Sequence, residues 1–277
     1  MNNRNLVFIH IPKTAGTTLN SILERHYPKR NTFSFWQNVD QIVREFPEWP
    51  IERRRQIRLL KGHMPFGLHR FLVGESRYIT VLRAPVERIV SHYFFVKRTP
   101  RHYLYQQVIE RNLSLAEYAS SGITEELDNG QVRLLAGIDR SIPYGSCGRE
   151  HLELAKRNVE EHFAVVGLSE RFEESLALMG IELGWNWIPY YQAMNITEGR
   201  PKERQIDPSI LKSIERDNQF DLELYAWVAK RFEEKLDLHR DEVLLRLARL
   251  ARANKIYRPL HALRDHVRKV ARGALFK

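Results

Sequence analysis

The stretch Leu6-Val-Phe-Ile-His-Ile-Pro-Lys-Thr-Ala-Gly-Thr-Thr18 decides the fold of this 277-residue chain. Its first six residues are mostly apolar and rich in β-branched side chains, and Pro12 ends them, which predicts a short buried strand. Leu19, Ile22 and Leu23 then recur at helical spacing, so a tight loop over residues 12–18 joins this strand to a helix. The order of strand, loop and helix is typical of an α/β fold.

Two later stretches repeat this order. Residues 78–82 are apolar, end at Ala84-Pro85 and precede a helical pattern through Val86, Ile89, Val90 and Tyr93. Residues 163–167 precede another helical pattern over residues 171–179. Short buried strands that alternate with helices predict a parallel sheet covered by helices. We therefore expect an α/β fold of three layers, P-loop-like, with a central parallel sheet and a basic helical tail at the C-terminal end.

Most of the remaining chain has a helical pattern, and a boundary is predicted near Leu238. Helices are expected over residues 38–46, 103–111, 114–120, 150–161 and 207–236. The domain would cover residues 1–238, and residues 239–277 would form a basic amphipathic tail whose helix breaks at Pro259. Two interpretations of the tail stay open. Its apolar stripe packs on the domain or on a second subunit, or it lies on an anionic membrane surface and brings the protein to a glycolipid.

The formal charge of +10 is concentrated in this tail. From Arg240 onward the chain has 11 Lys and Arg residues against three acidic ones. The body before it is nearly neutral, which argues against a nucleic-acid-binding domain.

Nothing in the sequence predicts an anchor, a disulfide or a metal site. The first apolar run has about six residues, far fewer than a signal-peptide core or a membrane span needs, so we expect a cytoplasmic protein. Cys147 is the single cysteine and is interpreted as an ordinary thiol. We expect no metal.

The loop over residues 12–18 is suited to hold an anion. Gly16 lets the main chain approach a ligand closely, and the N–H groups at the helix start point toward it. Lys13 adds a positive charge, and hydroxyl donors come from Thr14, Thr17 and Thr18. A Walker A loop needs Lys directly after its second Gly, whereas Lys13 precedes the only Gly here. An ordinary strand-to-helix turn with a threonine cap is the alternative.

His10-Ile-Pro-Lys-Thr-Ala-Gly-Thr-Thr18 resembles the 5′-phosphosulfate-binding loop of the carbohydrate sulfotransferases that use 3′-phosphoadenosine 5′-phosphosulfate (PAPS). It resembles especially the branch of the heparan sulfate and uronyl 2-O-sulfotransferases. Val81-Leu-Arg-Ala-Pro-Val-Glu-Arg-Ile-Val-Ser-His-Tyr93 is similar to the 3′-phosphate motif of that family, Arg-x-Pro-x-x-Arg-x-x-Ser-x-Tyr. The resemblance extends over residues 5–236. It implies transfer of a sulfuryl group from PAPS to a hydroxyl of a carbohydrate acceptor.

The resemblance also implies which residues bind PAPS. The 5′-phosphosulfate would be bound by Lys13, Thr14, Ala15, Gly16, Thr17 and Thr18. Arg83 and Ser91 would bind the 3′-phosphate, since Arg83 follows a parallel strand at the end where α/β folds bind ligands. Leu168 and Ser169, in a third similar segment, would lie near the nucleotide. Arg88 would either contribute to this phosphate site or be a salt-bridged residue of the helix, and the sequence favours neither.

Acceptor chemistry is assigned by the same resemblance. His63 occupies the place of the catalytic histidine, which follows a glycine in those enzymes and often belongs to a His-x-His pair. Pro65 stands at the second position, so His69 is a candidate substitute and substrate contact. Arg133, in a segment like the Asn-x-Gln-x-Arg-x-Leu motif of the family, is a further candidate contact with the acceptor, or else an internally paired helix residue.

The expected reaction is an in-line displacement in which positioning and charge dominate. His63 would take the acceptor proton, and Lys13 would stabilise the leaving nucleotide. Two alternatives remain, a P-loop-type kinase and a non-catalytic protein that binds polyanions or glycans. A P-loop-type kinase should have a Gly-Lys-[Ser/Thr] loop, and this sequence does not show one. The hypothesis of a non-catalytic binding protein does not explain why Arg83 and Ser91 occur at the spacing of the 3′-phosphate motif. A homo-oligomer is compatible with all three.

Overall fold

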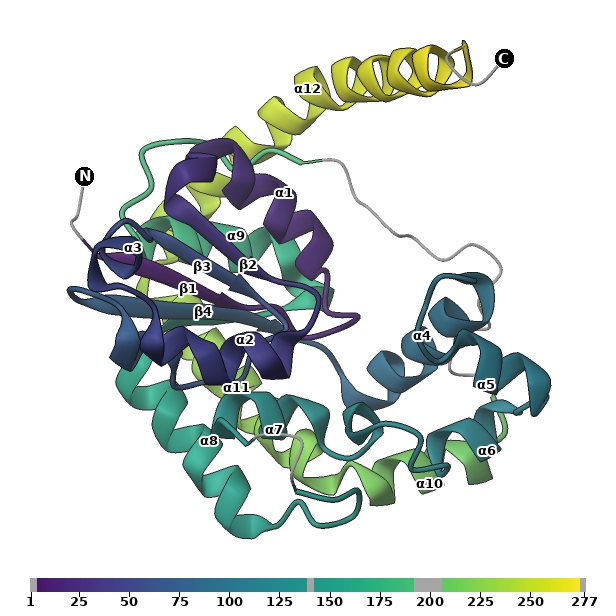
Figure 1. Cartoon of the computed structure of the whole chain (residues 1–277). Helices are drawn as coiled ribbons and strands as arrows, with labels where there is room; N and C mark the ends of the chain where they lie inside the picture. Colours follow the sequence, from purple (N-terminus) through teal and green to yellow (C-terminus); the bar gives the residue numbers. More distant parts are fainter. Residues whose placement is uncertain (1–3, 139–141, 192–205, 275–277) are drawn as a thin grey trace.

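A computed structural model describes residues 4–138, 142–191 and 206–274, with side chains through residue 257. Five parallel strands form one sheet at its centre (Figure 1). They are β1 (Asn5–Ile9), β2 (Thr32–Phe35), β3 (Leu59–Gly62), β4 (Ser76–Leu82) and β5 (Phe163–Leu168). The order across the sheet is β2-β3-β1-β4-β5. The three predicted strands correspond to β1, β4 and β5, and β2 and β3 were missed.

Helices cover both faces of the sheet, so the predicted three-layer α/β fold is confirmed. Figure 1 shows α1, α9 and α12 on one face and α7, α8 and α11 on the other. Their bounds are α1 Gly16–His26, α7 Gly130–Ala136, α8 Arg149–His162, α9 Phe172–Glu182, α11 Gln219–Leu238 and α12 Arg240–Ala274. The main core is the apolar layer between these helices and the strands. Two shorter helices, α2 (Val39–Glu45) and α3 (Ile51–Arg55), lie between β2 and β3 in the chain.

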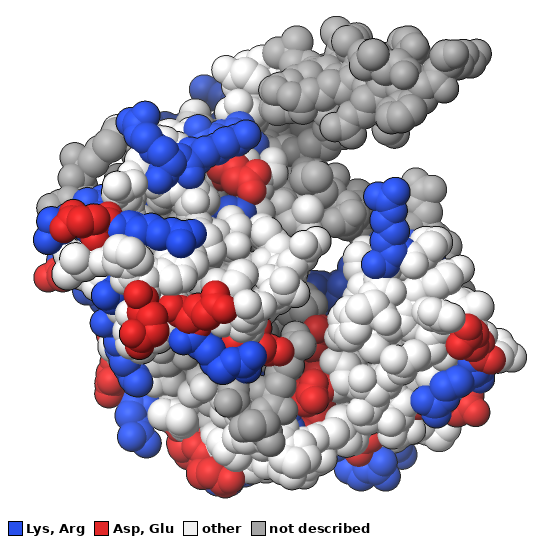
Figure 2. Space-filling model, viewed as in Figure 1, with Lys and Arg blue, Asp and Glu red and all other residues white. Residues whose placement is uncertain are grey.

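A second hydrophobic cluster forms a helical lobe beside the sheet. It is built from α4 (Pro85–Arg98), α5 (Tyr105–Glu110), α6 (Leu115–Ala119) and α10 (Pro208–Asp217). Ile89, Tyr118 and Ile214 are buried at its centre. Because α4 starts directly after β4, the lobe begins at the carboxyl edge of the sheet. Figure 2 shows a hollow between the lobe and the body of the sheet, with charged side chains along its walls.

The position of β1 creates a ligand crevice. β1 pairs with β3 on one side and with β4 on the other. From the end of β1 the chain turns toward β2 and β3, and from the end of β4 it turns toward β5. Loops that leave neighbouring parallel strands in opposite directions open a crevice at the carboxyl edge of the sheet, which is where α/β folds bind ligands.

Two helix predictions were wrong in detail. The single helix predicted over residues 207–236 is two helices, because the buried side chain of Asn218 donates to the carbonyl oxygens of Leu127 and Ile214 and accepts from the N–H of Asn129. The tail does not break at Pro259, since α12 runs from Arg240 to Ala274. A proline removes one donor from the helical ladder, and the helix can continue through it with a local bend.

The first turns of α12 belong to the main body. Val243 and Leu250 are buried in the main core, where α12 packs on α9. Arg246 donates to the carbonyl oxygen of Trp185 at 3.2 Å, and Asn254 accepts from the N–H of Tyr191 at 2.8 Å. These contacts fit the interpretation that the tail packs on its own domain, for this part of the tail. The proposed boundary near Leu238 stays a prediction.

Candidate functional site

The loop between β1 and α1 concentrates unusual main-chain geometry. Lys13 and Ala15 both have positive φ values, of 70° and 64°, which residues with a side chain rarely adopt. The hydroxyl of Thr14 is turned inward and donates to the carbonyl oxygen of Ile11 at 2.9 Å. Such strain persists where the surrounding structure enforces it, and it gathers at ligand sites. α1 starts at Gly16 without a side-chain cap, and its N-terminal end lies at this loop, which is the arrangement of an anion site at a helix start.

Gly16 is required by packing. A Cβ atom at this position would overlap the imidazole ring of His10. That ring is buried, and its Nδ1 lies 3.1 Å from Nδ2 of Asn20. Burial, together with the nearby positive charges of His63, Lys61 and Lys13, lowers the pKa of His10 well below its ordinary value. His10 is therefore an uncharged side chain that packs beneath the loop.

His63 lies directly beside His10. Its Nδ1 is 2.7 Å from the carbonyl oxygen of His10, and the two rings are stacked with centroids 4.5 Å apart. A carbonyl oxygen can only accept, so we assign the proton to Nδ1 and the basic lone pair to Nε2. Gly62, with φ of 136°, makes the turn into His63, and a Cβ there would overlap the carbonyl oxygen of Phe35. The indole of Trp36, which is partly exposed, stands edge to face with His63 at 5.1 Å.

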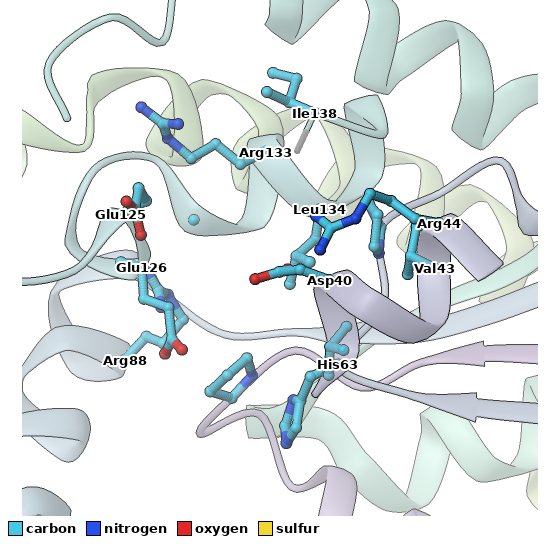
Figure 3. Close-up of a pocket in the computed structure, with 14 residues that line it drawn as sticks. Asp40, Val43, Arg44, His63, Arg88, Glu125, Glu126, Arg133, Leu134 and Ile138 are labelled. Atoms are coloured by element: carbon cyan, nitrogen blue, oxygen red, sulfur yellow. The ribbon is translucent and has the colours of Figure 1, made fainter. Parts of the chain in front are cut away.

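A pocket of about 280 Å³ opens beside His63. Figure 3 shows Glu125, Glu126 and Arg88 on one side, Asp40, Val43 and Arg44 on the other, and Arg133 and Ile138 beyond them. The pocket is also lined by Pro12, Val39, Pro65, Gly130 and Leu134. His63 therefore faces a space between α2, α7 and the start of the loop over residues 12–18, called the anion loop below.

Arg83 joins the two sequence motifs. Its Nη1 donates to the carbonyl oxygen of Lys13 at 3.1 Å, and its Nη2 pairs with Glu87 at 3.1 Å. The buried side chain of Gln131 holds the main chain of Arg83 from both sides, since Oε1 accepts from its N–H and Nε2 donates to its carbonyl oxygen, each at 3.0 Å. The guanidinium is thus fixed beside the anion loop.

The other predicted nucleotide residues surround this point. Ser91 is buried on α4, and one turn later the ring of Phe95 lies 3.7 Å below the Nζ of Lys13. Leu168 ends β5, and Ser169 begins the turn that follows. Glu170 in that turn accepts from the N–H of Ala84 at 3.0 Å, which ties the turn to the Arg83 loop. The structure therefore brings residues 13–18, Arg83, Ser91, Leu168 and Ser169 to one edge of the sheet.

Arg88 and Arg133 line the pocket, but their guanidinium groups bind the protein. Nη2 of Arg88 donates to the carbonyl oxygen of Glu126 at 2.7 Å and lies 3.5 Å from the buried Asp221. Arg133 pairs with Asp128, and it also donates to the carbonyl oxygens of Asp128, Ile142 and Pro143. Both side chains support the pocket wall, and the contacts of Arg133 match the internally paired alternative.

His69 is not brought to this pocket. Its Nδ1 lies 2.9 Å from the hydroxyl of Tyr78, and its ring packs on Phe66 and His162. Burial, with the charges of His162 and Arg70, lowers the pKa of His69 to about 4. Cys147 is buried, and burial, helped by Asp128, raises the pKa of its thiol to about 12. That value fits the interpretation of an ordinary thiol.

Sequence reasoning missed Glu126 on the pocket wall and the buried His92 behind it. His92 follows Ser91 within a recognised motif, but nothing local indicates that its ring meets Glu126, with Nε2 3.1 Å from Oε2. Within the described residues, no group of three or more His, Cys, Asp or Glu side chains is placed to hold a metal ion. Among the helices of the described chain, none combines the length and apolar character of a membrane span.

Comparison with known proteins identifies the family. The sequence profile of the family described as galactose-3-O-sulfotransferase matches residues 1–269. The heparan sulfate 2-O-sulfotransferase hst-2 of Caenorhabditis elegans is 26% identical over 64% of this chain and 59% of its own length. The heparan-sulfate 6-O-sulfotransferase 2 of Homo sapiens is 24% identical over 86% of this chain and 46% of its own length. The chain thus spans about half of the curated relatives it matches.

One solved structure is also similar. The mouse sulfotransferase SULT7A1 complexed with PAP is 14% identical, covers 80% of this chain and 65% of its own, and gives a TM-score of 0.39, too low to carry an inference about this chain. The profile match extends over nearly the whole sequence, and it agrees with the resemblance to carbohydrate sulfotransferases seen in the two motifs. The chain therefore belongs to the galactose-3-O-sulfotransferase family.

Proposed function

We propose that this protein transfers a sulfuryl group from PAPS to a hydroxyl of a carbohydrate. The observation that carries the proposal is the contact between Arg83 and the carbonyl oxygen of Lys13 at 3.1 Å. It shows that the loop resembling a 5′-phosphosulfate site and the loop resembling a 3′-phosphate site are neighbours. One nucleotide with phosphates at both ends of its ribose can then reach both loops.

The nucleotide would be bound as follows. The N–H groups at the start of α1 and the hydroxyls of Thr17 and Thr18 would bind the 5′-phosphosulfate. Arg83 and Ser91 would bind the 3′-phosphate, with Glu87 giving up its contact with Arg83. Leu168 and Ser169 would lie along the nucleotide, because their turn is tied to the Arg83 loop by Glu170.

The chemical step needs one base and one cation. Nε2 of His63 takes the proton of the acceptor hydroxyl while the oxygen attacks sulfur. The bond between sulfur and the bridging oxygen of PAPS breaks in line, and adenosine 3′,5′-bisphosphate leaves. Lys13 stabilises the negative charge that develops on that bridging oxygen. The carbonyl oxygen of His10 keeps the Nδ1 proton of His63 in place, so that Nε2 stays the basic atom.

The acceptor would enter the pocket beside His63. Its volume of about 280 Å³ lies near the lower end of small-ligand pockets, roughly 300–1,000 Å³. That size suits the terminal ring of a glycan. The relatives named for heparan sulfate act on carbohydrate polymers, which agrees with a sugar hydroxyl as the class of acceptor.

A nucleotide-binding experiment tests the proposal first. Adenosine 3′,5′-bisphosphate should raise the melting temperature, whereas ATP with Mg²⁺ should not, and radioactive PAPS should label a glycan acceptor. Stabilisation by ATP alone would favour a P-loop-type kinase. Binding of sulfated glycans without any nucleotide effect would favour a non-catalytic glycan-binding protein.

We also propose that the outer face of α12 contacts an anionic lipid surface. Leu244, Leu245 and Ile256 on this face are 60%, 50% and 61% exposed, and Arg252 and Lys255 beside them are exposed as well. Apolar and basic side chains on one helix face suit a membrane interface with negative lipids. A second copy is a poorer occupant, because two basic helices repel each other. A cytoplasmic location would supply such a surface.

A further inference from the structure

The acceptor pocket contains a fixed negative charge. Glu126 belongs to a short turn, Glu125–Leu127, that forms one wall of the pocket, and its side chain is 25% exposed. Figure 3 shows it on the wall that faces Asp40 and Arg44, with His63 below. Arg88 and Arg133 lie on the same wall, but their guanidinium groups are bound to oxygen atoms of the protein.

A chain of buried side chains holds Glu126 in place. Nε2 of His92 lies 3.1 Å from Oε2 of Glu126, although the direction is poor for a hydrogen bond, and Nδ1 of His92 lies 2.7 Å from the hydroxyl of Tyr118. Burial, and next the charge of Glu126, raise the pKa of Tyr118 far above its ordinary value, so the phenol keeps its proton. Its hydroxyl thus anchors the His92 ring at Nδ1, and Nε2 on the other side of the ring faces the carboxylate.

The same contacts keep Glu126 ionised. Burial by itself favours the neutral acid, but the positive charge of protonated His92 and its contact with the carboxylate, supported by the charges of His63 and Arg88, lower the pKa of Glu126 to about 2. The residue is therefore a carboxylate at every pH at which the protein would work. A held carboxylate binds sugar hydroxyls by charge-assisted hydrogen bonds and repels a second anion nearby.

We propose that Glu126 is a specificity residue of the acceptor pocket, selecting a sugar ring that carries hydroxyls and excluding one that carries a carboxylate or sulfate beside the reacting hydroxyl. This inference rests on the proposed function, since it takes the pocket beside His63 as the acceptor site. His92 and Tyr118 are positioning residues, which fix the charge without reaching the acceptor.

Equilibrium binding tests the inference without requiring turnover. The probes are phenyl β-glucoside with phenyl β-glucuronide, and phenyl β-galactoside with phenyl β-galacturonide, each pair differing only in a C6 carboxylate. Calorimetry is done in the presence of adenosine 3′,5′-bisphosphate. We expect the wild-type protein to bind the neutral member of at least one pair about tenfold or more tightly than the acidic member. Glu126→Gln should bring the two affinities within about threefold of each other.

Glu125→Gln is the matched control. It removes the same charge one residue away, and it should leave at least a fivefold preference, about half of the wild-type value. Glu126→Asp keeps the charge but shortens the side chain, so it should keep the preference while weakening binding of the neutral sugar. Its result also covers the case in which Glu126→Gln does not fold.

The outcomes separate this inference from the proposed function. Equal or tighter binding of the uronides by wild type, binding of neither sugar, or an unchanged preference in Glu126→Gln overturns the role of Glu126. Failure of PAPS to donate its sulfuryl group overturns the proposed function, whatever the binding preference is. A wild-type preference that disappears in Glu126→Gln supports the role of Glu126 even then.

Discussion

Nδ1 of His63 lies 2.7 Å from the carbonyl oxygen of His10, two residues before the loop over residues 12–18 that would hold the anion. The proposed base is thus held by the main chain of the segment that would bind the sulfuryl donor. The orientation of the His63 ring is therefore fixed by a main-chain atom.

His63→Ala should lower kcat by about 10²–10⁴-fold and leave binding of adenosine 3′,5′-bisphosphate unchanged, because it removes only the base. In wild type the rate should fall at low pH, since a protonated ring cannot accept a proton. The variant should lack that acidic limb. His69→Ala is the control and should stay near wild type, and an inactive His69→Ala would show that the base has been wrongly assigned.

Lys13→Ala should lower turnover by about 10²-fold or more, because the charge acts on the leaving oxygen in the transition state. Nucleotide affinity should fall much less. Lys97→Ala removes an exposed charge from α4 and serves as the control in the same transfer assay with PAPS. Turnover near wild type in purified Lys13→Ala would refute the role.

Arg83→Ala should weaken PAPS binding by about 2–4 kcal/mol, because a charge-assisted contact with a doubly charged group is lost. The measurement compares adenosine 3′,5′-bisphosphate with adenosine 5′-phosphate by calorimetry. Wild type should prefer the bisphosphate strongly, and the variant should not. Equal preference in both proteins would mean that Arg83 does not bind the 3′-phosphate.

Gly16→Ala should destabilise the protein and abolish nucleotide binding, because the new methyl group would overlap the ring of His10. Thermal unfolding of Gly16→Ala, His10→Ala and the double variant forms a double-mutant cycle. The double variant should lose less stability than the sum of the single losses, since the ring that causes the overlap is gone. Strictly additive losses would contradict the packing explanation.

Two truncations separate the roles of α12. Removal of all residues after Leu238 should lower the melting temperature, because it uncovers the core around Val243 and Leu250. Removal of the residues after Tyr257 should leave the fold and the activity on a small soluble acceptor intact.

The membrane proposal has its own variants. Leu244→Glu combined with Leu245→Glu, in the full chain, should weaken salt-sensitive binding to liposomes that contain phosphatidylserine. The control is neutral phosphatidylcholine liposomes. If the full chain does not bind anionic liposomes at low salt, the membrane proposal is wrong.

The sequence predicts β1, β4 and β5 because each is an apolar run with a clear end. β3 was not predictable, because Lys61 interrupts it. This lysine is fully buried only because Glu24 and Asn20, which come from α1, meet its Nζ at 2.7 and 3.2 Å. β2 has only four residues and is mostly half-buried, so it carries little local signal.

The residues at the nucleotide edge of the sheet could be predicted from the sequence, whereas those of the acceptor pocket wall could not. Lys13 and Arg83 belong to motifs whose spacing along the chain is visible. Glu126 and His92 belong to separate elements, and their contact depends on how α4 packs against the turn after α6. The meeting of two such elements leaves no periodic pattern. It follows from tertiary packing alone.

The central place of β1 also governs how the protein is made. Leu6 pairs with Leu59, and Asn5 pairs with Ser76, so β1 has no partner close to it in sequence. Long chain loops must close before these contacts form, and such non-local pairing makes folding slow. On the ribosome, residues 5–11 emerge before β3 and β4 exist and wait as an unpaired apolar strand. An apolar strand that must wait for distant partners is prone to aggregation during synthesis, and in this chain that strand leads directly into the anion loop.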